Sequence, residues 1–219
     1  MSIRKVSFAT GEYYHIFNRG NSKQKIFNNK NDYNRFVGLM YACNQKENFK
    51  IDNLKKGGNL LELEKSTKLV DIGAYCLMPN HFHILLTQQE NDNISKFLQK
   101  LTTAYVMYYN KKYSRTGGLF EGKFKSEHIN SDRYLKYIFS YIHLNPIKLI
   151  NKDWKETGIK EKSKTIEYLN QYIYSSYIDY MGTEREEKKV LNKQAFPKYF
   201  PSTKLFLNEI FEWLNYKQK

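Results

Sequence analysis

The fold of this chain is decided by residues 76–86, which read CLMPNHFHILL. Proline and asparagine favour turns, so Pro79 and Asn80 predict a tight turn between two apolar runs. We therefore predict two adjacent strands, at about residues 69–77 and 81–88. The other elements of the chain are expected to surround this hairpin.

The second of these strands carries a pair of histidines. Successive side chains of a strand point to opposite faces, so His81 and His83 share one face while Phe82 and Ile84 share the other. Two imidazoles about 6–7 Å apart along a strand suit the binding of one divalent metal ion. An isolated pair of this kind is more often two half-exposed histidines on a hairpin, so its interpretation depends on the rest of the chain.

Length and composition are those of one globular unit. With 219 residues, 41% of them hydrophobic and 26% charged, the chain can form one sizeable core, or one domain with an appendage. We predict one domain over residues 1–180, containing a surface insertion at 48–68. A helical tail at 181–219 is expected to pack on the same domain.

The sequence shows no membrane or secretion signal. No apolar run approaches the roughly 18–20 residues that cross a bilayer, and residues 1–10 lack the apolar segment and cleavage site of a secretory signal. Cys43 and Cys76 lie within apolar stretches, as expected for buried, reduced thiols of a cytosolic protein.

The strongest signal in the composition is positive charge. The chain has 36 Lys and Arg against 22 Asp and Glu, a net charge of +14. Such an excess favours a polyanionic partner through phosphate contacts and counterion release. Aromatic residues make up 16% of the chain and suit stacking on unpaired bases. Biased codon usage is the alternative explanation for this composition.

The remaining elements follow from turn signals, helix caps and hydrophobic periodicity. They are a strand at 13–19, helices at 33–47, 94–111 and 133–145, and a strand at 119–126. Together with the central hairpin, the order is strand, helix, strand, strand, helix, strand, helix. This order predicts an α+β fold, a split βαβ sandwich in which an antiparallel sheet carries helices mainly on one face.

Two basic segments are candidates for phosphate contact. The first is the loop at 19–25, and the second is the hairpin-like stretch at 111–125. Their candidate DNA-binding residues are Arg19, Asn21, Lys23, Lys111, Lys112, Arg115, Lys123 and Lys125. The alternative in both cases is a solvated, charged surface.

The helix that Pro146 ends carries Tyr141 and Asn145 one turn apart on one face. With His81 and His83 they supply two imidazoles, an amide oxygen and a phenol. Two histidines and an asparagine leave open coordination positions, as a catalytic metal requires. A neighbouring phenol can attack a phosphodiester, releasing a 3′-hydroxyl and forming a 5′-phosphotyrosine.

Three tyrosines of this helix lie broadly on the face of Asn145, so periodicity alone does not identify the nucleophile. At 1.5 Å per residue, Tyr141, Tyr137 and Tyr134 lie about 6, 12 and 16 Å along the axis from Asn145. An in-line attack brings the reacting atoms to about 3–3.5 Å, which favours the nearest phenol, Tyr141.

The chain resembles the single-tyrosine HUH transposases, and in particular the branch of REP-associated tyrosine transposases. The segments that carry the resemblance, in the family's order, are YHIFNRGN at 14–21, MPNHFH at 78–83, GLFEGKF at 118–124, YIHLNP at 141–146 and SSY at 175–177. The stretch at 48–68 is longer than that family leads us to expect.

The resemblance implies the ferredoxin-like HUH fold and a Mg²⁺ or Mn²⁺ ion. It matches His81 and His83 to metal ligands, Asn145 to the third ligand and Tyr141 to the nucleophile. The implied substrate is single-stranded DNA that bears a hairpin, such as a REP-like palindrome. A cytoplasmic, nucleoid-associated protein, monomeric or homodimeric, is expected.

Two other functions are compatible with parts of this pattern. Ferredoxin-like sheets with exposed aromatics also bind single-stranded nucleic acid without catalysis, but such a module does not require histidines facing a tyrosine. A zinc hydrolase needs a further nitrogen, sulfur or carboxylate ligand and a general base, and neither is evident nearby.

Overall fold

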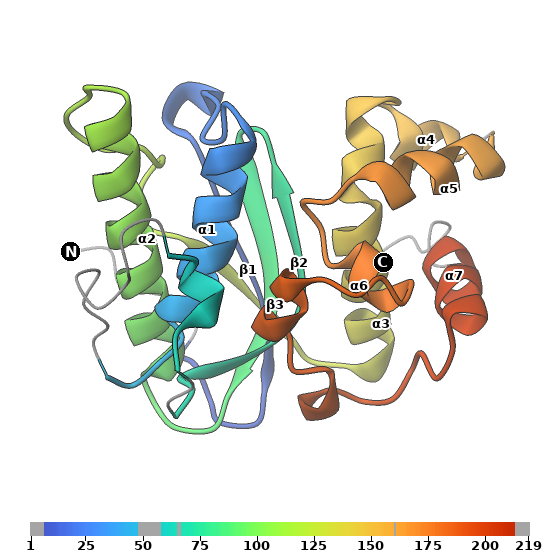
Figure 1. The fold of residues 1–219 in the computed structure, drawn as a ribbon. Helices are drawn as coiled ribbons and strands as arrows, with labels where there is room; N and C mark the ends of the chain where they lie inside the picture. The colour runs from blue at the N-terminus through green and yellow to red at the C-terminus, as the bar shows by residue number, and fades with distance from the viewer. Residues whose placement is uncertain (1–6, 48–57, 65–66, 160, 213–219) are drawn as a thin grey trace.

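The computed structural model describes residues 7–47, 58–64, 67–159 and 161–212, which are built around a four-stranded antiparallel sheet (Figure 1). The strands are β1 (Tyr13–Arg19), β2 (Val70–Met78), β3 (His81–Gln88) and β4 (Lys125–Ile129), in the order β2-β3-β1-β4. Because β3 pairs antiparallel with both β1 and β2, those two strands run parallel with β3 between them. The predicted α+β split βαβ fold is confirmed.

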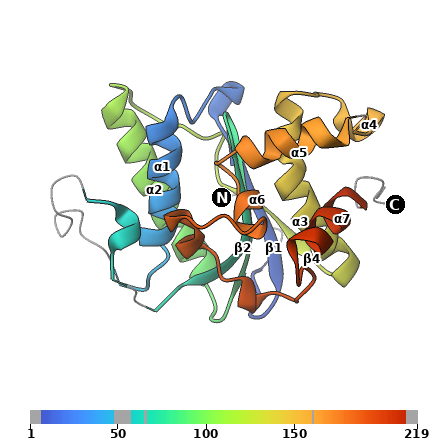
Figure 2. The ribbon, with the colours of Figure 1, turned by 45° about the vertical axis from the view of Figure 1, so that its right-hand side comes forward.

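Helices cover both faces of the sheet (Figures 1 and 2). Helices α1 (Lys30–Ala42) and α2 (Asn93–Lys112) pack on one face, and α3 (Asp132–Leu144) packs on the other. The expectation of helices mainly on one face was therefore wrong. The second face is apolar enough to need a cover, because Ala74, Cys76 and Leu85 point to it and are fully buried.

The C-terminal third encloses the outer side of α3. Its short helices are α4 (Trp154–Thr157), α5 (Lys162–Gln171), α6 (Tyr177–Tyr180) and α7 (Thr203–Glu212), with 3₁₀ turns at Asn145–Leu149, Glu186–Val190 and Lys193–Ala195. Phe206 and Ile210 of α7 share a buried cluster with Leu144 of α3. The tail thus packs on the same body, while the boundary at residue 180 stays a prediction.

Helix α1, predicted at 33–47 and observed at Lys30–Ala42, and strand β4, predicted at 119–126 and observed at Lys125–Ile129, differ most from their predicted bounds. Helix α1 starts at Lys30 because Asn29 is its N-cap, and Asp32 closes a capping box with it instead of capping a later start. Strand β4 begins at Lys125 and not at residue 119. Gly122 has φ of 139°. The residues before β4 meet the end of β1 through an isolated bridge between Phe120 and Gly20 and a hydrogen bond from the amide of Glu121 to the carbonyl of Arg19, without forming a regular strand.

The predicted insertion at 48–68 lies partly outside the described residues, namely at 48–57 and 65–66. The described part of this segment is not entirely exposed to solvent. Leu60 and Leu61, in the 3₁₀ turn Leu60–Glu62, are buried, and a Cβ on Gly38 of α1 would lie 3.0 Å from Cβ of Leu60. The segment therefore contributes to the core beside α1. Cys43 and Cys76 are buried and free, as predicted.

Candidate active site

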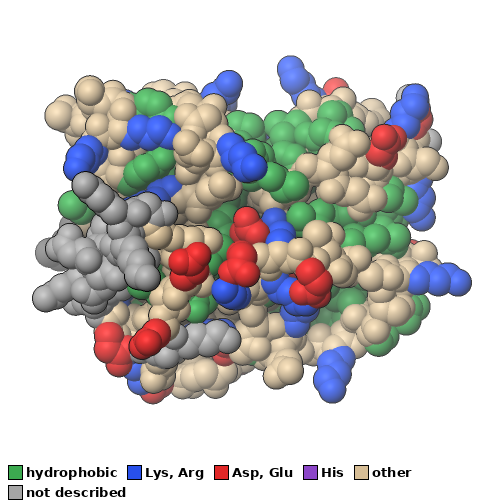
Figure 3. Space-filling model, in the orientation of Figure 1, with side chains coloured by type: hydrophobic (Ala, Val, Ile, Leu, Met, Phe, Trp, Pro, Cys, Tyr) green, Lys and Arg blue, Asp and Glu red, His purple; other side chains and the backbone are tan. Residues whose placement is uncertain are grey.

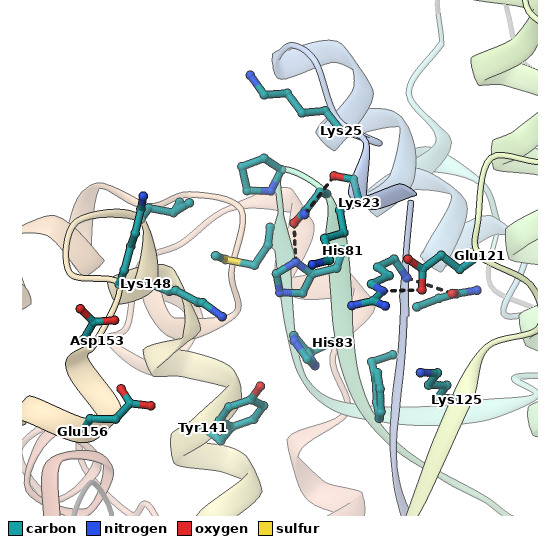
Figure 4. Close-up of a pocket in the computed structure, with 18 residues that line it drawn as sticks. Lys23, Lys25, His81, His83, Glu121, Lys125, Tyr141, Lys148, Asp153 and Glu156 are labelled. Carbon is teal, nitrogen blue, oxygen red and sulfur yellow. Dashed lines mark hydrogen bonds and ion pairs between the residues drawn. The ribbon is translucent and has the colours of Figure 1, made fainter. Parts of the chain in front are cut away.

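Strands β1 and β3 and helix α3 enclose a cavity of about 1000 Å³ next to the turn between β2 and β3 (Figure 4). His81, His83 and Tyr141 point into this space from β3 and α3. The two imidazoles lie on one face of β3, with ring centroids 5.0 Å apart, and the rings are nearly perpendicular. Phe82 points to the opposite face, into the core beneath α1 and α2. The alternation inferred from the sequence is confirmed.

The turn that precedes His81 is fixed by the loop after β1. The carbonyl of Pro79 accepts hydrogen bonds from the amides of Ile26 and Phe27, and the carbonyl of Asn80 accepts one from the amide of Gly20. A Cβ on Gly20 would lie 2.2 Å from the carbonyl oxygen of Gln24, so this close approach requires glycine.

Asn80 orients the first histidine. Its amide nitrogen donates to the carbonyl of Lys23 at 3.2 Å, so its Oδ1 faces Nδ1 of His81 at 2.7 Å. Since Oδ1 only accepts, Nδ1 of His81 carries the proton and Nε2 keeps its lone pair. Burial lowers the pKa of His81 to about 4, which favours the neutral form that binds metals.

The second histidine belongs to a chain of polar contacts across three strands. Nδ1 of His83 lies 2.8 Å from Nε2 of His15 on β1. Nδ1 of His15 in turn lies 3.5 Å from a carboxylate oxygen of Glu127 on β4. His15 and His83 are almost fully buried.

Sequence reasoning assigned no role to His15 or Glu127. The signal for His15 was present, because alternation along β1 places it on the same face as Phe17, whose partner across the ladder is His83. Glu127 was missed because the strand that carries it was predicted too early in the chain.

Tyr141 and Asn145 complete the site from the α3 side. The ring centroids of Tyr141 and His83 lie 5.4 Å apart, and the Asn145 side chain hydrogen-bonds to both Tyr141 and His81. Burial raises the pKa of the Tyr141 phenol, and the bond with Asn145 partly opposes that shift. Tyr137 and Tyr134 continue as a stack of rings away from the cavity.

Helix α3 is held against β2 by a second buried histidine. Nε2 of His143 lies 2.8 Å from Oγ of Ser176, and the same oxygen accepts from the amide of Tyr75 on β2 at 2.9 Å. Burial lowers the pKa of His143 to about 3, so this residue is neutral. The YIHLNP and SSY segments are therefore in contact, and their contact fixes the helix that presents Tyr141.

The side chains that could hold a metal ion in this site are two histidines and an asparagine. In the described part of the chain, no group of three or more His, Cys, Asp or Glu side chains is placed to bind one ion. The third donor is instead the amide of Asn145, which is 4% exposed and hydrogen-bonds to His81. Two imidazole nitrogens and an amide oxygen, with the rest of the cavity open, fit a divalent ion that keeps free coordination positions.

Cations outnumber carboxylates in the lining of the cavity. Among its lining residues are six Lys or Arg and three carboxylates, namely Arg19, Lys23, Lys25, Lys125, Lys148, Lys152, Glu121, Asp153 and Glu156. Figure 4 shows Lys23, Lys25 and Lys125 on the sheet side and Lys148 on the side of Tyr141. By contrast, acidic and basic side chains mix on the face shown in Figure 3.

The predicted DNA-binding residues separate into two groups. Arg19, Lys23 and Lys125 line the cavity, although Arg19 is paired with Glu121. Lys25, Lys148 and Lys152 join them without having been assigned from the sequence. The other candidates do not line this cavity, and they are Asn21, Lys111, Lys112, Arg115 and Lys123.

Lys112 has a structural partner. Its Nζ lies 2.6 Å from Oδ1 of the fully buried Asp32 and 3.1 Å from Oδ1 of Asn29 at the start of α1. Arg115 lies over the ring of Tyr109. The contacts of Lys112 hold the end of α2 against the start of α1.

The fold and the site define a class of protein in which an antiparallel ferredoxin-like sheet presents a histidine pair to a tyrosine on a covering helix. The family described as IS200-like transposases matches residues 9–145, more than half of the chain, and the chain belongs to this family. In the described residues, no helix has the length and apolar character needed to cross a membrane.

Individual relatives agree with this assignment. Over 95 residues the chain is 28% identical to a protein of Haemophilus influenzae described as a REP-associated tyrosine transposase. The alignment covers 37% of this chain and 54% of that protein, so the chain spans about half the length of this curated relative. The resemblance to the REP-associated branch is thereby confirmed.

Solved structures support the fold. A REP-associated tyrosine transposase bound to a REP hairpin has a TM-score of 0.50 and 13% identity, covering 85% of this chain and 90% of that one. A tRNA(His) guanylyltransferase of Saccharomyces cerevisiae, with 15% identity, covers 91% of this chain and 86% of its own. Its TM-score of 0.38 is too low to support an argument.

Proposed function

We propose that this transposase-family protein is a metal-dependent endonuclease and strand transferase for single-stranded DNA. It cleaves and rejoins DNA beside hairpins through a covalent 5′-phosphotyrosine on Tyr141. The observation that carries the proposal is the convergence of Tyr141, His81 and His83 on one cation-lined cavity. Since the substrate is cellular DNA, the protein would act in the cytoplasm, at the nucleoid.

His81, His83 and Asn145 would hold a Mg²⁺ or Mn²⁺ ion. The proton on Nδ1 of His81 leaves its Nε2 available, and burial keeps this ring neutral. When bound, the ion would supply positive charge that polarises a non-bridging phosphate oxygen. Imidazole is not the ligand that magnesium prefers, so we expect modest affinity and tighter binding of Mn²⁺.

Tyr141 would act as the nucleophile. Its oxygen forms a bond to phosphorus while the bond from phosphorus to the 3′-oxygen breaks, the phenol loses its proton and the leaving 3′-oxygen gains one. Burial raises the pKa of this phenol, so the phenolate depends on nearby positive charge and on the bond with Asn145. Attack by another 3′-hydroxyl reverses the step and joins a new strand without ATP.

The walls of the cavity would bind the DNA backbone. Lys23, Lys25 and Lys125 on the sheet side and Lys148 on the opposite side would contact phosphates on either side of the scissile bond. The solved relative is bound to a REP hairpin, which supports a hairpin-bearing strand as the substrate of this chain. Because Tyr141 faces the histidines of its own chain, a monomer would contain all these groups.

A cleavage assay tests the proposal. Hairpin-bearing and hairpin-free single strands, labelled at either end, are incubated with the protein and Mg²⁺, Mn²⁺ or EDTA, and the products are run on a denaturing gel. We expect a metal-dependent protein–DNA adduct on the strand that is 3′ of the cut. Tight binding of the hairpin strand with no adduct under any metal condition would favour the alternative, a non-catalytic single-stranded nucleic-acid-binding protein.

A further inference from the structure

The contact chain His83–His15–Glu127 fixes where the protons of the two imidazoles lie. His15 stands directly opposite Glu127 in the ladder between β1 and β4. At 3.5 Å, the contact between Nδ1 of His15 and the carboxylate is longer than an ideal hydrogen bond. Nδ1 nevertheless has no nearer hydrogen-bond partner among the described residues, so its proton is directed toward this carboxylate.

A carboxylate only accepts, so a neutral His15 that directs an N–H toward it carries that proton on Nδ1. Its Nε2 then has a lone pair and accepts from Nδ1 of His83 at 2.8 Å. His83 therefore carries its proton on Nδ1 as well, and its Nε2 keeps the lone pair. Tyr134 donates a further hydrogen bond to Glu127 at 3.1 Å, which holds the carboxylate in place.

We propose that His15, aligned by Glu127, is a positioning residue that fixes the proton of His83 on Nδ1, so that Nε2 of His83 carries the lone pair that would bind the metal. The inference rests on the metal site of the proposed function. It also accounts for the buried contact between His15 on β1 and His83 on β3. Metal-binding histidines commonly depend on such partners for ring orientation and tautomer.

The two ligand histidines are thus oriented by different means. His81, at the edge of the site, takes its tautomer from the adjacent Asn80, whereas His83, deeper in the sheet, takes it from His15 on the neighbouring strand. Loss of His15 would leave the Nδ1 proton of His83 without its acceptor. The ring of His83 would then adopt the other tautomer or rotate, and its Nε2 would no longer be available to the metal.

The test compares three variants. His15→Phe keeps a ring on β1 but removes both nitrogens, and His15→Gln restores an amide oxygen close to the former Nε2. His128→Phe is the matched control, because His128 also pairs with a glutamate, Glu12 at 2.8 Å, while its ring lies against Tyr14, which belongs to the core beneath α1 and α2. Thermal unfolding of each variant first establishes that it is folded.

Side-chain nitrogen NMR of the metal-free proteins gives the first readout. The spectra are recorded at about pH 8, above the pKa of about 6.5 of a free histidine, and the side-chain nitrogen shifts assign the tautomer of each ring directly. We expect wild-type His83 to carry its proton on Nδ1 and to lose this preference in His15→Phe. A wild-type His83 protonated on Nε2 would overturn the inference, and this measurement needs no variant to fold.

Titration with Mn²⁺ gives the second readout. We expect His15→Phe to weaken Mn²⁺ binding about 10- to 100-fold, His15→Gln to recover most of it, and His128→Phe to leave it unchanged. Normal wild-type binding together with unchanged binding in His15→Phe would overturn this inference alone. Absence of Mn²⁺ binding in the wild type would overturn the metal site of the proposed function, and the inference with it.

Discussion

The two faces of the central sheet differ in what they bury. Toward α1 and α2 the sheet presents Tyr14, Ile16, Phe82 and Ile84, which form one apolar core. Toward α3 the same strands present a polar site beside a smaller apolar cluster. Burial is similar on both sides, since His83 is 6% exposed and Phe82 is fully buried. Adjacent residues of one strand thus belong to two different environments, Phe82 to the apolar core and His83 to the candidate site.

This difference shows how a small sheet accommodates a reactive site. Buried polar groups are costly unless they are hydrogen-bonded. On the α3 face His83 has His15, His81 has Asn80, and Tyr141 has Asn145. Because the apolar face supplies most of the packing, the α3 face can hold the groups that would carry out the proposed DNA chemistry. Substitutions on the two faces should therefore have distinct consequences.

The largest expected effect comes from Tyr141→Phe. Removing one oxygen leaves the ring packing on His83 and Tyr137 in place but removes the nucleophile, so the covalent adduct should fall below detection on a denaturing gel. Folding and hairpin binding should be retained. Tyr137→Phe and Tyr134→Phe are the controls and should still form the adduct. An adduct that persists in Tyr141→Phe, mapped by peptide mass analysis to another residue, would overturn the assignment.

The second prediction concerns the histidine pair. Replacing His81 and His83 together by Ala should lower metal-dependent cleavage by at least about 100-fold, because the stabilisation of phosphate charge by a bound ion amounts to several kcal/mol. Single-turnover cleavage with Mn²⁺ measures the effect, and binding of uncleaved hairpin DNA is the control. Cleavage at the wild-type rate in this double variant would exclude the proposed ligands.

A substitution on the apolar face should lower stability and leave cleavage unchanged, the reverse of the effect expected for the histidine pair. Phe82→Ala should lower the free energy of unfolding by about 3–5 kcal/mol, because it opens a cavity under Phe36 and Phe120. Denaturant unfolding measures this loss, and cleavage by the folded protein at low temperature should stay near the wild-type rate. His81→Ala, one residue away, should alter stability by less than about 1 kcal/mol. Loss of cleavage in folded Phe82→Ala would show that the faces are coupled.

The sequence predicted the features that depend on local pattern. Alternation along β3 placed both histidines on one face, and the spacing from Tyr141 to Asn145 placed phenol and amide one helical turn apart. Pro146 correctly marked the end of α3, which stops at Leu144. The family resemblance added the order of the motifs, and with it the expectation that these elements meet.

What the sequence did not predict depends on contacts between distant residues. The role of His15 requires the register of β1 against both β3 and β4, and that register depends on where β4 begins. Lys112 was counted as a free cation because its partner, Asp32, lies 80 residues away in sequence. The cover on the second face comes from α3 and from a tail whose shortest helices, α4 and α6, show little hydrophobic periodicity in the sequence.

The smallest expected effect is on the salt dependence of DNA binding. It should distinguish lysines that line the cavity from lysines elsewhere on the protein. Lys125 lines the cavity and Lys111, exposed near the end of α2, does not. Each substitution by Ala removes one positive charge, so both change the net charge equally. On single strands, each neutralised phosphate contributes about 0.7 to the slope of log affinity against log salt. Lys125→Ala should therefore flatten that slope by up to about 0.7, and Lys111→Ala should leave it unchanged.

Fluorescence anisotropy of a labelled hairpin strand, measured over a range of salt concentrations, gives both slopes. Lys123→Ala is a second control, since Lys123 lies two residues before Lys125 but does not line the cavity. If Lys125→Ala and Lys111→Ala change the slope equally, binding follows the overall charge of +14 and not the cavity. A larger change for Lys111→Ala would move the DNA path to the end of α2, away from Tyr141. A slope that responds only to Lys125 would place the DNA backbone beside the histidine pair, where the proposed chemistry requires it.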